Sequence, residues 1–191
     1  MRRIIVSMNI TIDGFMAGPD GGLDWHLQNW STDMSDLLAQ QLNTADTILL
    51  GKNTYSAMAG YWPAVSTCLS LSREDLAYAD MINRYPKVVC SRTLKTLRWA
   101  NSKLISANIR QEILKLKQQP GKNILIYGSH KLVQYLNSHN LIDEYLLWLY
   151  PVSIGSGMQL FKQRQNLQLI NTQTLPSGVV VLKYSTGIKQ P

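Results

Sequence analysis

The segment NILIYGSHKLVQYL, residues 123–136, decides the fold class of this chain. Its first five residues, which are mostly apolar, predict a buried strand. A Gly-Ser pair follows, and then Leu132, Val133 and Leu136 recur at the spacing of one helix face. Because a parallel sheet needs a helical crossover between its strands, this strand, turn and helix unit indicates an α/β fold.

The same alternation of strand and helix extends along the chain. The turn-rich residues 13–22 are expected to form a long loop. We expect a mainly parallel central sheet with flanking helices and an antiparallel C-terminal hairpin through Pro176-Ser177-Gly178. The expected strands are 2–12, 47–50, 87–90, 104–106, 123–127, 144–152, 167–169 and 179–184, and the expected helices are 32–43, 52–60, 72–85, 109–117 and 132–136.

The composition suits one compact domain. The 191 residues are 45% hydrophobic and 16% charged, so we expect a single domain spanning residues 1–191. No apolar stretch approaches the ~20 residues that a membrane-spanning helix needs. Cys68 and Cys90 lack a neighbouring Cys or a His cluster, so we expect buried thiols and no metal site. Such cysteines suit a reducing compartment, and we expect a cytoplasmic protein.

The net charge of +7 indicates an affinity for anions without identifying the anion. Nucleic acid would attract such a protein, and so would a small polyanion such as a dinucleotide phosphate. The basic residues are spread along the chain, and no common nucleic-acid-binding motif is present. We therefore expect a small-molecule substrate, and neither nucleic acid nor a membrane as partner.

Three turns that each follow a predicted strand carry residues suited to holding phosphate groups. Gly51-Lys52-Asn53-Thr54 combines outward-turning amides, a positive charge and a helix N-terminus. Ser91-Arg92-Thr93 offers hydroxyls and a fork-shaped cation that could grip a phosphate monoester, which would favour NADPH over NADH. Gly128-Ser129-His130 could cradle a pyrophosphate with its backbone amides. In open α/β sheets, ligands lie where such turns meet, beyond the carboxyl ends of the strands.

Each turn also has an ordinary structural interpretation. Gly51 could simply end a strand beside a solvated Lys52. Arg92 could be one of the many arginines that face solvent. Gly128 is a single glycine rather than a full G-x-G-x-x-G motif, so Ser129 could act only as a helix cap. Taken one at a time, the turns therefore do not decide the function.

The ordered set of motifs resembles the dihydrofolate reductase-like proteins. It is most similar to the bacterial group that resembles the reductase domain of the bifunctional riboflavin-biosynthesis deaminase-reductase. The resemblance covers nearly the whole chain, and its specificity lies in the order of the pieces. The matching segments are 7–18 ending in IDGFMAG, GLDW at 22–25, 45–55, SRTL at 91–94, GS at 128–129, LIDEY at 141–145, PV at 151–152, GSG at 155–157 and SGVV at 177–180.

The resemblance implies NADPH as the cofactor and a role for each turn. Lys52-Asn53-Thr54 would hold the cofactor phosphates, and Ser91-Arg92 would meet the phosphate on the adenosine ribose. Gly128-Ser129 would lie against the pyrophosphate. Met16-Ala17-Gly18, in the first loop, would flank the nicotinamide.

The chain departs from the family pattern at three places. Relatives often carry Gly-Gly-Ser at Tyr127-Gly128-Ser129, so the bulky Tyr127 could narrow the pyrophosphate site. They often carry Arg in place of Lys52, which keeps the charge but loses the bidentate fork. Dihydrofolate reductases orient their pterin with a carboxylate shortly after the tryptophan of the first loop, where this chain has Gln28-Asn29. Folate reduction is therefore not expected.

The substrate side is expected beside residues 14–22, which would act as a lid. Asp24 is the candidate catalytic acid, with water as the other source of a proton, and Trp25 is the candidate substrate contact. Asp33 is an alternative acid, and so is Asp13, which is also a typical turn residue before Gly14. A set of aromatic residues could stack on a flat heterocycle or could belong to the core, namely Trp25, Trp30, Tyr61 and Trp62.

These residues and the resemblance together predict hydride transfer from NADPH to a small pterin-like or pyrimidine-like heterocycle. Two alternatives stay open. One is reduction of a ribosylamino-pyrimidine in riboflavin biosynthesis, although we expect no attached deaminase domain. The other is a non-catalytic protein that binds or senses NADPH. Relatives of this kind commonly dimerise, and the strand at 145–152 with the loop at 155–157 could form a contact between two copies.

Overall fold

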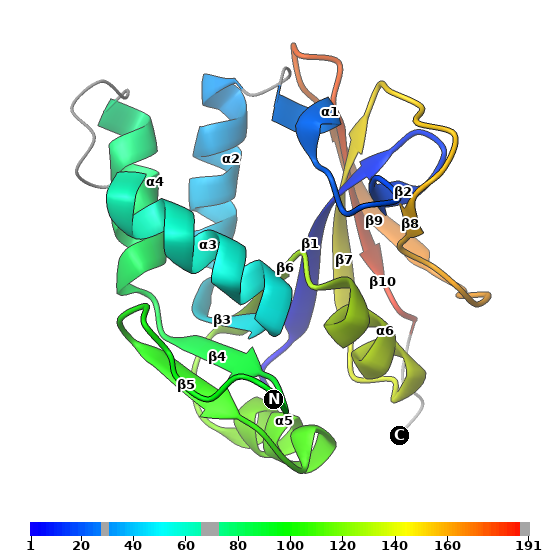
Figure 1. Cartoon of the computed structure of the whole chain (residues 1–191). Coiled ribbons are helices and arrows are strands. Elements are labelled where there is room, and N and C mark those ends of the chain that lie inside the picture. Colours follow the sequence, from blue (N-terminus) through cyan, green and yellow to red (C-terminus); the bar gives the residue numbers. More distant parts are fainter. Residues whose placement is uncertain (28–30, 66–72, 188–191) are drawn as a thin grey trace.

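The computed structural model describes residues 1–27, 31–65 and 73–187. Its strands are β1 (Ile4–Thr11), β2 (Phe15–Ala17), β3 (Ala45–Gly51), β4 (Lys87–Cys90), β5 (Ser102–Ile105), β6 (Asn123–Tyr127), β7 (Glu144–Tyr150), β8 (Met158–Gln159), β9 (Gln168–Thr174) and β10 (Val180–Ser185). Its helices are α1 (Asp24–Leu27), α2 (Thr32–Asn43), α3 (Lys52–Val65), α4 (Arg73–Arg84), α5 (Ile109–Gln118) and α6 (His130–Ser138). Figure 1 shows how the helices flank the sheet.

The central sheet has eight strands in the order β5-β4-β3-β6-β1-β7-β10-β9. Every pairing from β5 to β7 is parallel. The pairings of β10 with β7 and with β9 are antiparallel. The expected fold class, a mainly parallel sheet with an antiparallel C-terminal hairpin, is therefore confirmed.

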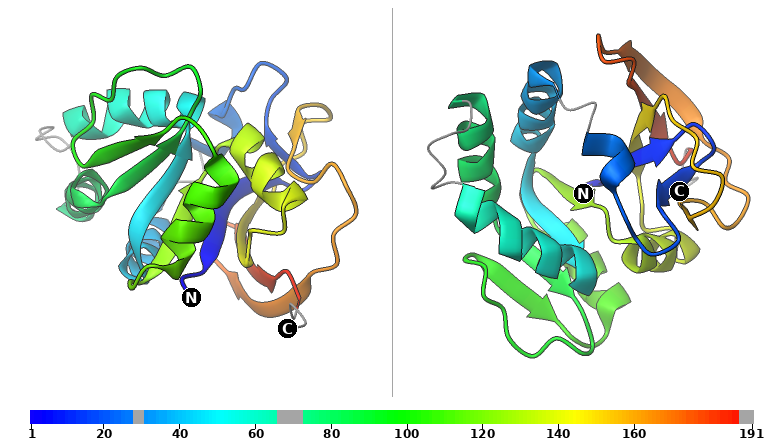
Figure 2. Two further views of the ribbon diagram at one scale, coloured as in Figure 1. Left: turned by 90° about the horizontal axis from the view of Figure 1, so that it is seen from below. Right: turned by 45° about the horizontal axis from the view of Figure 1, so that its top comes forward.

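The sheet is covered on both faces, and alternate residues of β1 show this arrangement. Ile4 and Val6 belong to a core cluster with residues of α5 and α6, such as Ile113 and Leu132. Ile5 belongs to a second cluster, with residues of α2, α3 and α4. Because successive side chains of a strand point to opposite faces, the two clusters are the two sides of one sheet. Both layers can be followed in Figures 1 and 2.

The expected long loop at 13–22 is only partly a loop. Phe15 to Ala17 form β2, which pairs antiparallel with β8. The amide of Gly14 donates to the Thr11 carbonyl and closes the turn before β2, and Met16 and Ala17 are buried. A strand of three residues between glycine-rich turns is too short to show an alternating pattern in the sequence. It can therefore be identified only from its pairing with a strand that is distant in sequence.

Helix α3 does not stop at Gly60 as expected but continues through Pro63 to Val65. Contacts with α4 hold its last turns, since Trp62 packs edge-on against Tyr78 and its carbonyl accepts a hydrogen bond from Asn83. These contacts offset the low helix propensity of glycine and proline. Residue 72, where the helix over 72–85 is expected to begin, lies outside the described residues.

Strand 145–152, expected to take part in a subunit contact, does not lie at an edge of the sheet. β7 lies inside the sheet, with β1 on one side and β10 on the other, and most of its residues are buried. Its edges and faces are thus occupied within one chain. The loop at 155–157 is also engaged internally, because Gly157 lies against the carbonyl of Ala17.

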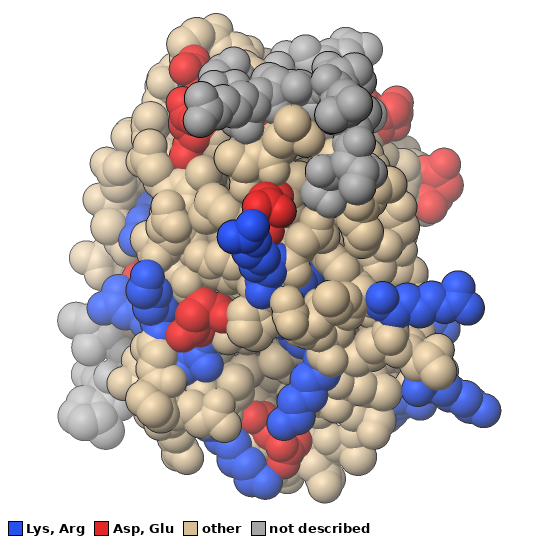
Figure 3. Space-filling model, turned by 90° about the vertical axis from the view of Figure 1, so that its left-hand side faces the viewer, with Lys and Arg blue, Asp and Glu red and all other residues tan. Residues whose placement is uncertain are grey.

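The surface agrees with the dispersed charge of the sequence. On the side of the molecule drawn in Figure 3, Lys and Arg are interspersed with Asp and Glu. Within the described part of the chain, no helix is long and apolar enough to cross a membrane. Cys90 is a free, buried thiol, as expected, whereas Cys68 lies outside the described residues.

Candidate nucleotide-binding site

The carboxyl ends of β4, β3 and β6 are adjacent in the sheet, and each is followed by one of the three predicted turns. Parallel strands that lie side by side deliver their following loops to the same edge. The topology therefore brings together segments that are up to about 80 residues apart in sequence, counted from 51 to 129.

The turn after β3 and the turn after β6 are in direct contact. The amide of Gly51 donates a hydrogen bond of 2.9 Å to Oγ of Ser129. Gly128 has φ +57°, and a Cβ built on it would lie 3.2 Å from Oγ1 of Thr54. This left-handed conformation and close approach both favour glycine, because an L side chain would meet the first turn of α3.

The turn after β4 joins the same edge. Nζ of Lys52 donates to Oγ1 of Thr93 over 3.1 Å. Oγ of the buried Ser91 accepts the amides of Thr93 and Leu94, which shapes the turn. Arg92, which lies between Ser91 and Thr93 in the sequence, is exposed. The cations Lys52 and Arg92 therefore both lie in the turns that meet at this edge.

Helix N-termini add to the positive potential of this edge. α3 begins at Lys52 and α6 begins at His130, and neither helix has an acidic residue in its first turn. The first amides of a helix lack intrahelical acceptors and carry the positive end of the helix dipole. Ser129, before α6, adopts the left-handed conformation with φ 68° and makes no side-chain cap. This arrangement can bind phosphate groups.

The first loop reaches the same edge through β8. Nε2 of His130 lies 3.1 Å from the carbonyl oxygen of Gln159 in β8. β8 in turn pairs with β2, which contains Met16 and Ala17. Burial lowers the pKa of His130, so its imidazole is neutral at pH 7 and donates to that carbonyl from Nε2. Gly18 follows β2 in a turn whose ends are joined by its amide and the Gly22 carbonyl.

Asp13 has a role that its position before Gly14 did not reveal. One carboxylate oxygen accepts hydrogen bonds from Oγ of Ser153 and from the amides of Ile154 and Gly155, at 2.8, 3.1 and 2.8 Å. The hydroxyl of Thr11 donates to the other oxygen. These donors, with Thr11 foremost, lower the pKa of Asp13 to about 2. An acid this strong stays ionised at neutral pH and ties the first loop to the β7–β8 loop.

Of the candidate substrate residues, Trp25 lies beside the end of β7. Asp24 opens α1 and is exposed, and Asp33 is exposed on α2. The Trp25 ring packs edge-on against Tyr150 with ring centroids 5.3 Å apart. Nε1 of Trp25 and the hydroxyl of Tyr150 are both buried without a hydrogen-bond partner among the described residues. Sequence reasoning missed Tyr150, because it ends an apolar strand and looks like a core residue.

The aromatic set does not form one pocket. Trp25 belongs with the cluster that contains Tyr150, whereas Trp62 packs with Tyr78 on the α3–α4 side. Tyr61 is exposed and contacts Trp62 edge-on. The core interpretation thus holds for Trp62. Trp30 and the pair Gln28-Asn29 lie outside the described residues.

Tyr127 ends β6, directly before the turn that carries Gly128, and its expected narrowing of the pyrophosphate site stays a prediction. Its ring packs with the core cluster of α2, α3 and α4, in the layer opposite α6. The described residues hold no group of three or more His, Cys, Asp or Glu side chains that could bind a metal ion. The edge therefore combines amides, hydroxyls and cations, which suit an organic phosphate.

Comparison with known proteins gives one family and several similar structures. Residues 2–181 match the model of the RibD C-terminal domain. Protein YyaP of Bacillus subtilis (strain 168) is 34% identical over 186 residues, which are 96% of this chain and 94% of YyaP.

Solved structures with lower identity share the fold. A Shewanella sp. PV-4 protein assigned to riboflavin biosynthesis has a TM-score of 0.71 at 20% identity, over 96% of this chain and 98% of its own. Dihydrofolate reductase from Enterococcus faecalis, in complex with NADP(H) and RAB-propyl, has a TM-score of 0.62 at 14% identity. That match covers 96% of this chain and 95% of the reductase.

Proposed function

The chain belongs to the RibD C-terminal domain family, and on that premise we propose that it is an NADPH-dependent reductase of a small pterin-like or pyrimidine-like heterocycle. One observation carries the proposal. Turns after three adjacent parallel strands make contact at one edge, through the bonds Gly51 to Ser129 and Lys52 to Thr93. Such an edge is where nucleotides bind in open α/β sheets.

Each part of the cofactor is assigned to one turn. Lys52-Asn53-Thr54, with the preceding Gly51, holds phosphate oxygens at the start of α3. Gly128-Ser129-His130 receives the pyrophosphate at the start of α6, where the glycine leaves room. Ser91-Arg92-Thr93 binds the phosphate on the adenosine ribose, because a guanidinium beside hydroxyls suits a phosphate monoester. Met16-Ala17-Gly18 flanks the nicotinamide.

When bound, NADPH would supply the hydride for an electron-poor C=N or C=O carbon. The chain's own residues hold the reactants together and exclude water. Asp24 is proposed to deliver a proton and Trp25 to contact the substrate, because both lie at the start of α1 and Trp25 packs beside the end of β7. Asp13 is ionised at neutral pH and positions the first loop instead.

The first experiment is a fluorescence titration with NADPH and NADH. Arg92→Glu is expected to raise the Kd for NADPH about 10- to 100-fold, because charge-assisted hydrogen bonds contribute about 1.5–3 kcal/mol. The Kd for NADH should change little. Arg98→Glu, an exposed arginine in the same connection between β4 and β5, is the matched control for net charge. Equal losses for both cofactors would overturn the assignment of Arg92.

Turnover separates the reductase from a protein that only senses NADPH. The absorbance of the reduced cofactor is followed with a panel of pterins, pyrimidines and a ribosylamino-pyrimidine. A catalyst oxidises NADPH with at least one of them, and Asp24→Asn should then lower kcat more than it raises KM. Absence of saturable NADPH binding would reject both the reductase and the sensor.

A further inference from the structure

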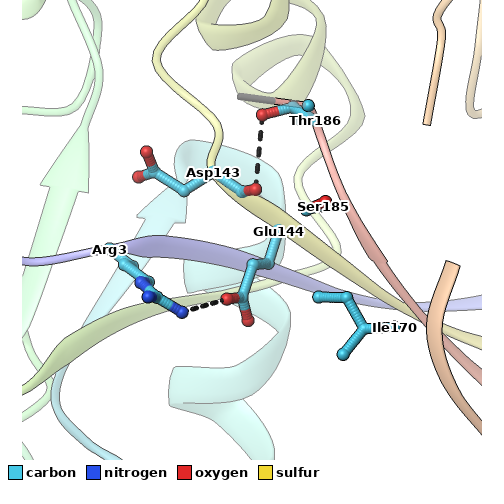
Figure 4. A pocket seen from close by; sticks show the side chains of 7 residues that line it. Arg3, Asp143, Glu144, Ile170, Ser185 and Thr186 are labelled. Atoms are coloured by element: carbon cyan, nitrogen blue, oxygen red, sulfur yellow. Dashed lines mark hydrogen bonds and ion pairs between the residues drawn. The ribbon is translucent and has the colours of Figure 1, made fainter. Parts of the chain in front are cut away.

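The two ends of the parallel strands are linked in different ways. At the amino ends of β1 and β7, Arg3 pairs with the buried Glu144 at 2.6 Å, and Figure 4 shows this ion pair within a hollow of about 300 Å³. At the carboxyl ends of β3 and β4, the cations Lys52 and Arg92 are exposed, and hydrogen bonds link the segments that carry them. A ligand that meets both cations therefore depends on what fixes the distance between these two segments.

A buried hydrogen bond joins the start of α3 to the connection between β4 and β5. Tyr55 lies in the same first turn of α3 as Lys52, and Trp99 lies in the connection at 91–101. The amide of Trp99 donates to the hydroxyl oxygen of Tyr55 over 2.9 Å, and both residues are buried. A buried amide without an acceptor is costly, so this bond fixes the backbone at Trp99 relative to α3.

The Trp99 ring is held by α4 and by the start of β4. Its Nε1 donates to Oδ1 of Asn83 over 2.7 Å, and Nδ2 of Asn83 donates to the Trp62 carbonyl in α3. Nζ of the buried Lys87 lies 4.3 Å from the ring centroid and donates to the carbonyl of Ala100. A cation over an aromatic face is attracted to it. These contacts give Trp99 a defined position relative to α3, α4 and β4.

The other end of the connection is fixed at Ser91. The Ser91 amide donates to the Ile105 carbonyl of β5, and Oγ of Ser91 accepts the amide of Thr93. Arg92 thus lies on a stretch of chain that is attached at Ser91 and at Trp99. Loss of the attachment at Trp99 would let Arg92 shift relative to α3, while the turn after β6 would stay in place.

We propose that Tyr55 is a positioning residue that sets the preference for NADPH over NADH. Its hydroxyl acts through Trp99 to hold Arg92 where the guanidinium reaches the phosphate on the adenosine ribose while the start of α3 holds other phosphate oxygens. NADH lacks that phosphate, so its binding does not use the position of Arg92. The inference rests on the proposed function, because it takes the cofactor contact of Arg92 as its premise.

Tyr55→Phe removes only the hydroxyl, and fluorescence titration with NADPH and NADH measures the effect. The Kd for NADPH should rise about 5- to 10-fold, which is less than the loss expected for Arg92→Glu, and the Kd for NADH should change less than about 2-fold. Tyr85→Phe is the matched control, because the Tyr85 hydroxyl also makes a 2.9 Å bond to a backbone group, the Leu42 carbonyl. Both variants should lose stability, but Tyr85→Phe should keep the wild-type Kd for both cofactors.

A double-mutant cycle separates positioning of Arg92 from a general loosening of the fold. In the Arg92→Glu variant, Tyr55→Phe should cause no further rise in the Kd for NADPH, since the guanidinium that Tyr55 positions is gone. A further rise of the same 5- to 10-fold in that variant would overturn the proposal.

The outcomes distinguish this inference from the proposed function. A wild type that does not bind NADPH, or that binds NADH equally well, would reject the cofactor assignment and the role of Tyr55 together. A wild type that prefers NADPH, with a folded Tyr55→Phe variant that keeps the same preference, would reject only the role of Tyr55. Circular dichroism establishes folding. If Tyr55→Phe is unfolded, Asn83→Leu decides by the same titrations, because it removes the bond to the Trp99 ring and should lower the preference too; an unchanged preference would overturn the proposal.

Discussion

Replacing Gly128 with alanine tests the turn on which the candidate site depends. An L residue in the left-handed region costs about 1–2 kcal/mol, whereas a more restricted unfolded chain returns about 0.4–1 kcal/mol. Gly128 has φ +57°, and a Cβ there would lie 3.2 Å from Oγ1 and 3.3 Å from Cγ2 of Thr54. We therefore expect a net loss of about 1 kcal/mol or more in the free energy of unfolding.

Gly60→Ala is the matched control because it makes the same chemical change without these constraints. Gly60 lies inside α3, and a Cβ there would meet nothing within 4 Å. Alanine should stabilise this helix by about 0.8–1 kcal/mol. In a chain of this size, Tm should therefore fall by roughly 2–4 °C for Gly128→Ala and rise by a similar amount for Gly60→Ala.

Urea unfolding gives the free energies, and NADPH titration of the folded variants gives the Kd. Gly128→Ala should weaken NADPH binding, since its amide would shift as Thr54 gives way, whereas Gly60→Ala should bind as the wild type does. If both variants change stability in the same direction, the steric argument is wrong. If Gly128→Ala is destabilised but binds NADPH normally, the pyrophosphate does not lie at this turn.

Three further changes test other parts of the structure. The pKa of Asp13 is about 2 in the folded state and 3.8 ordinarily, so its stabilising effect is complete above pH 3.8 and disappears as pH falls through 2. The difference in Tm between the wild type and Asp13→Ala should therefore shrink over that pH range. A constant difference would contradict the assigned hydrogen bonds. Lys117→Met should cost about 3 kcal/mol in urea unfolding, because it removes the buried ammonium group that pairs with the Asp143 carboxylate. A cost below about 1 kcal/mol would show that the pair contributes little. Burial raises the pKa of Cys90 to about 12. In a Cys68→Ser variant, a disulfide reagent at pH 8 should therefore label the Cys90 thiol only after unfolding. Rapid labelling of the folded variant would contradict the burial of Cys90.

The sequence predicted the elements that have a strong period of their own. The strand and helix on either side of Gly128, the buried β7 and the C-terminal hairpin were predicted from hydrophobic spacing and turn residues. These elements can be predicted from local patterns because each buries one face or one stripe, and the apolar residues of that face recur at a fixed spacing along the sequence. The turns proposed to hold phosphate were found in the same way, as polar residues directly after strands.

Elements that depend on a distant partner were missed or misjudged. β2 and β8 are too short to show a period and exist because they pair with each other. Helix α3 continues past Gly60 because Trp62 contacts α4. Asp13 was interpreted as a turn residue, because no residue near it in sequence indicates that its hydrogen-bond donors lie at residues 153–155.

The sequence alone therefore determined the fold class and the residue types that could meet a dinucleotide. Only the tertiary structure decided that those residues share one edge, because strand order and not chain order makes β4, β3 and β6 neighbours. The same strand order places β7 inside the sheet and β9 at its outer edge. Which strand lies at an edge depends on long-range pairing, and no local run of residues can specify it.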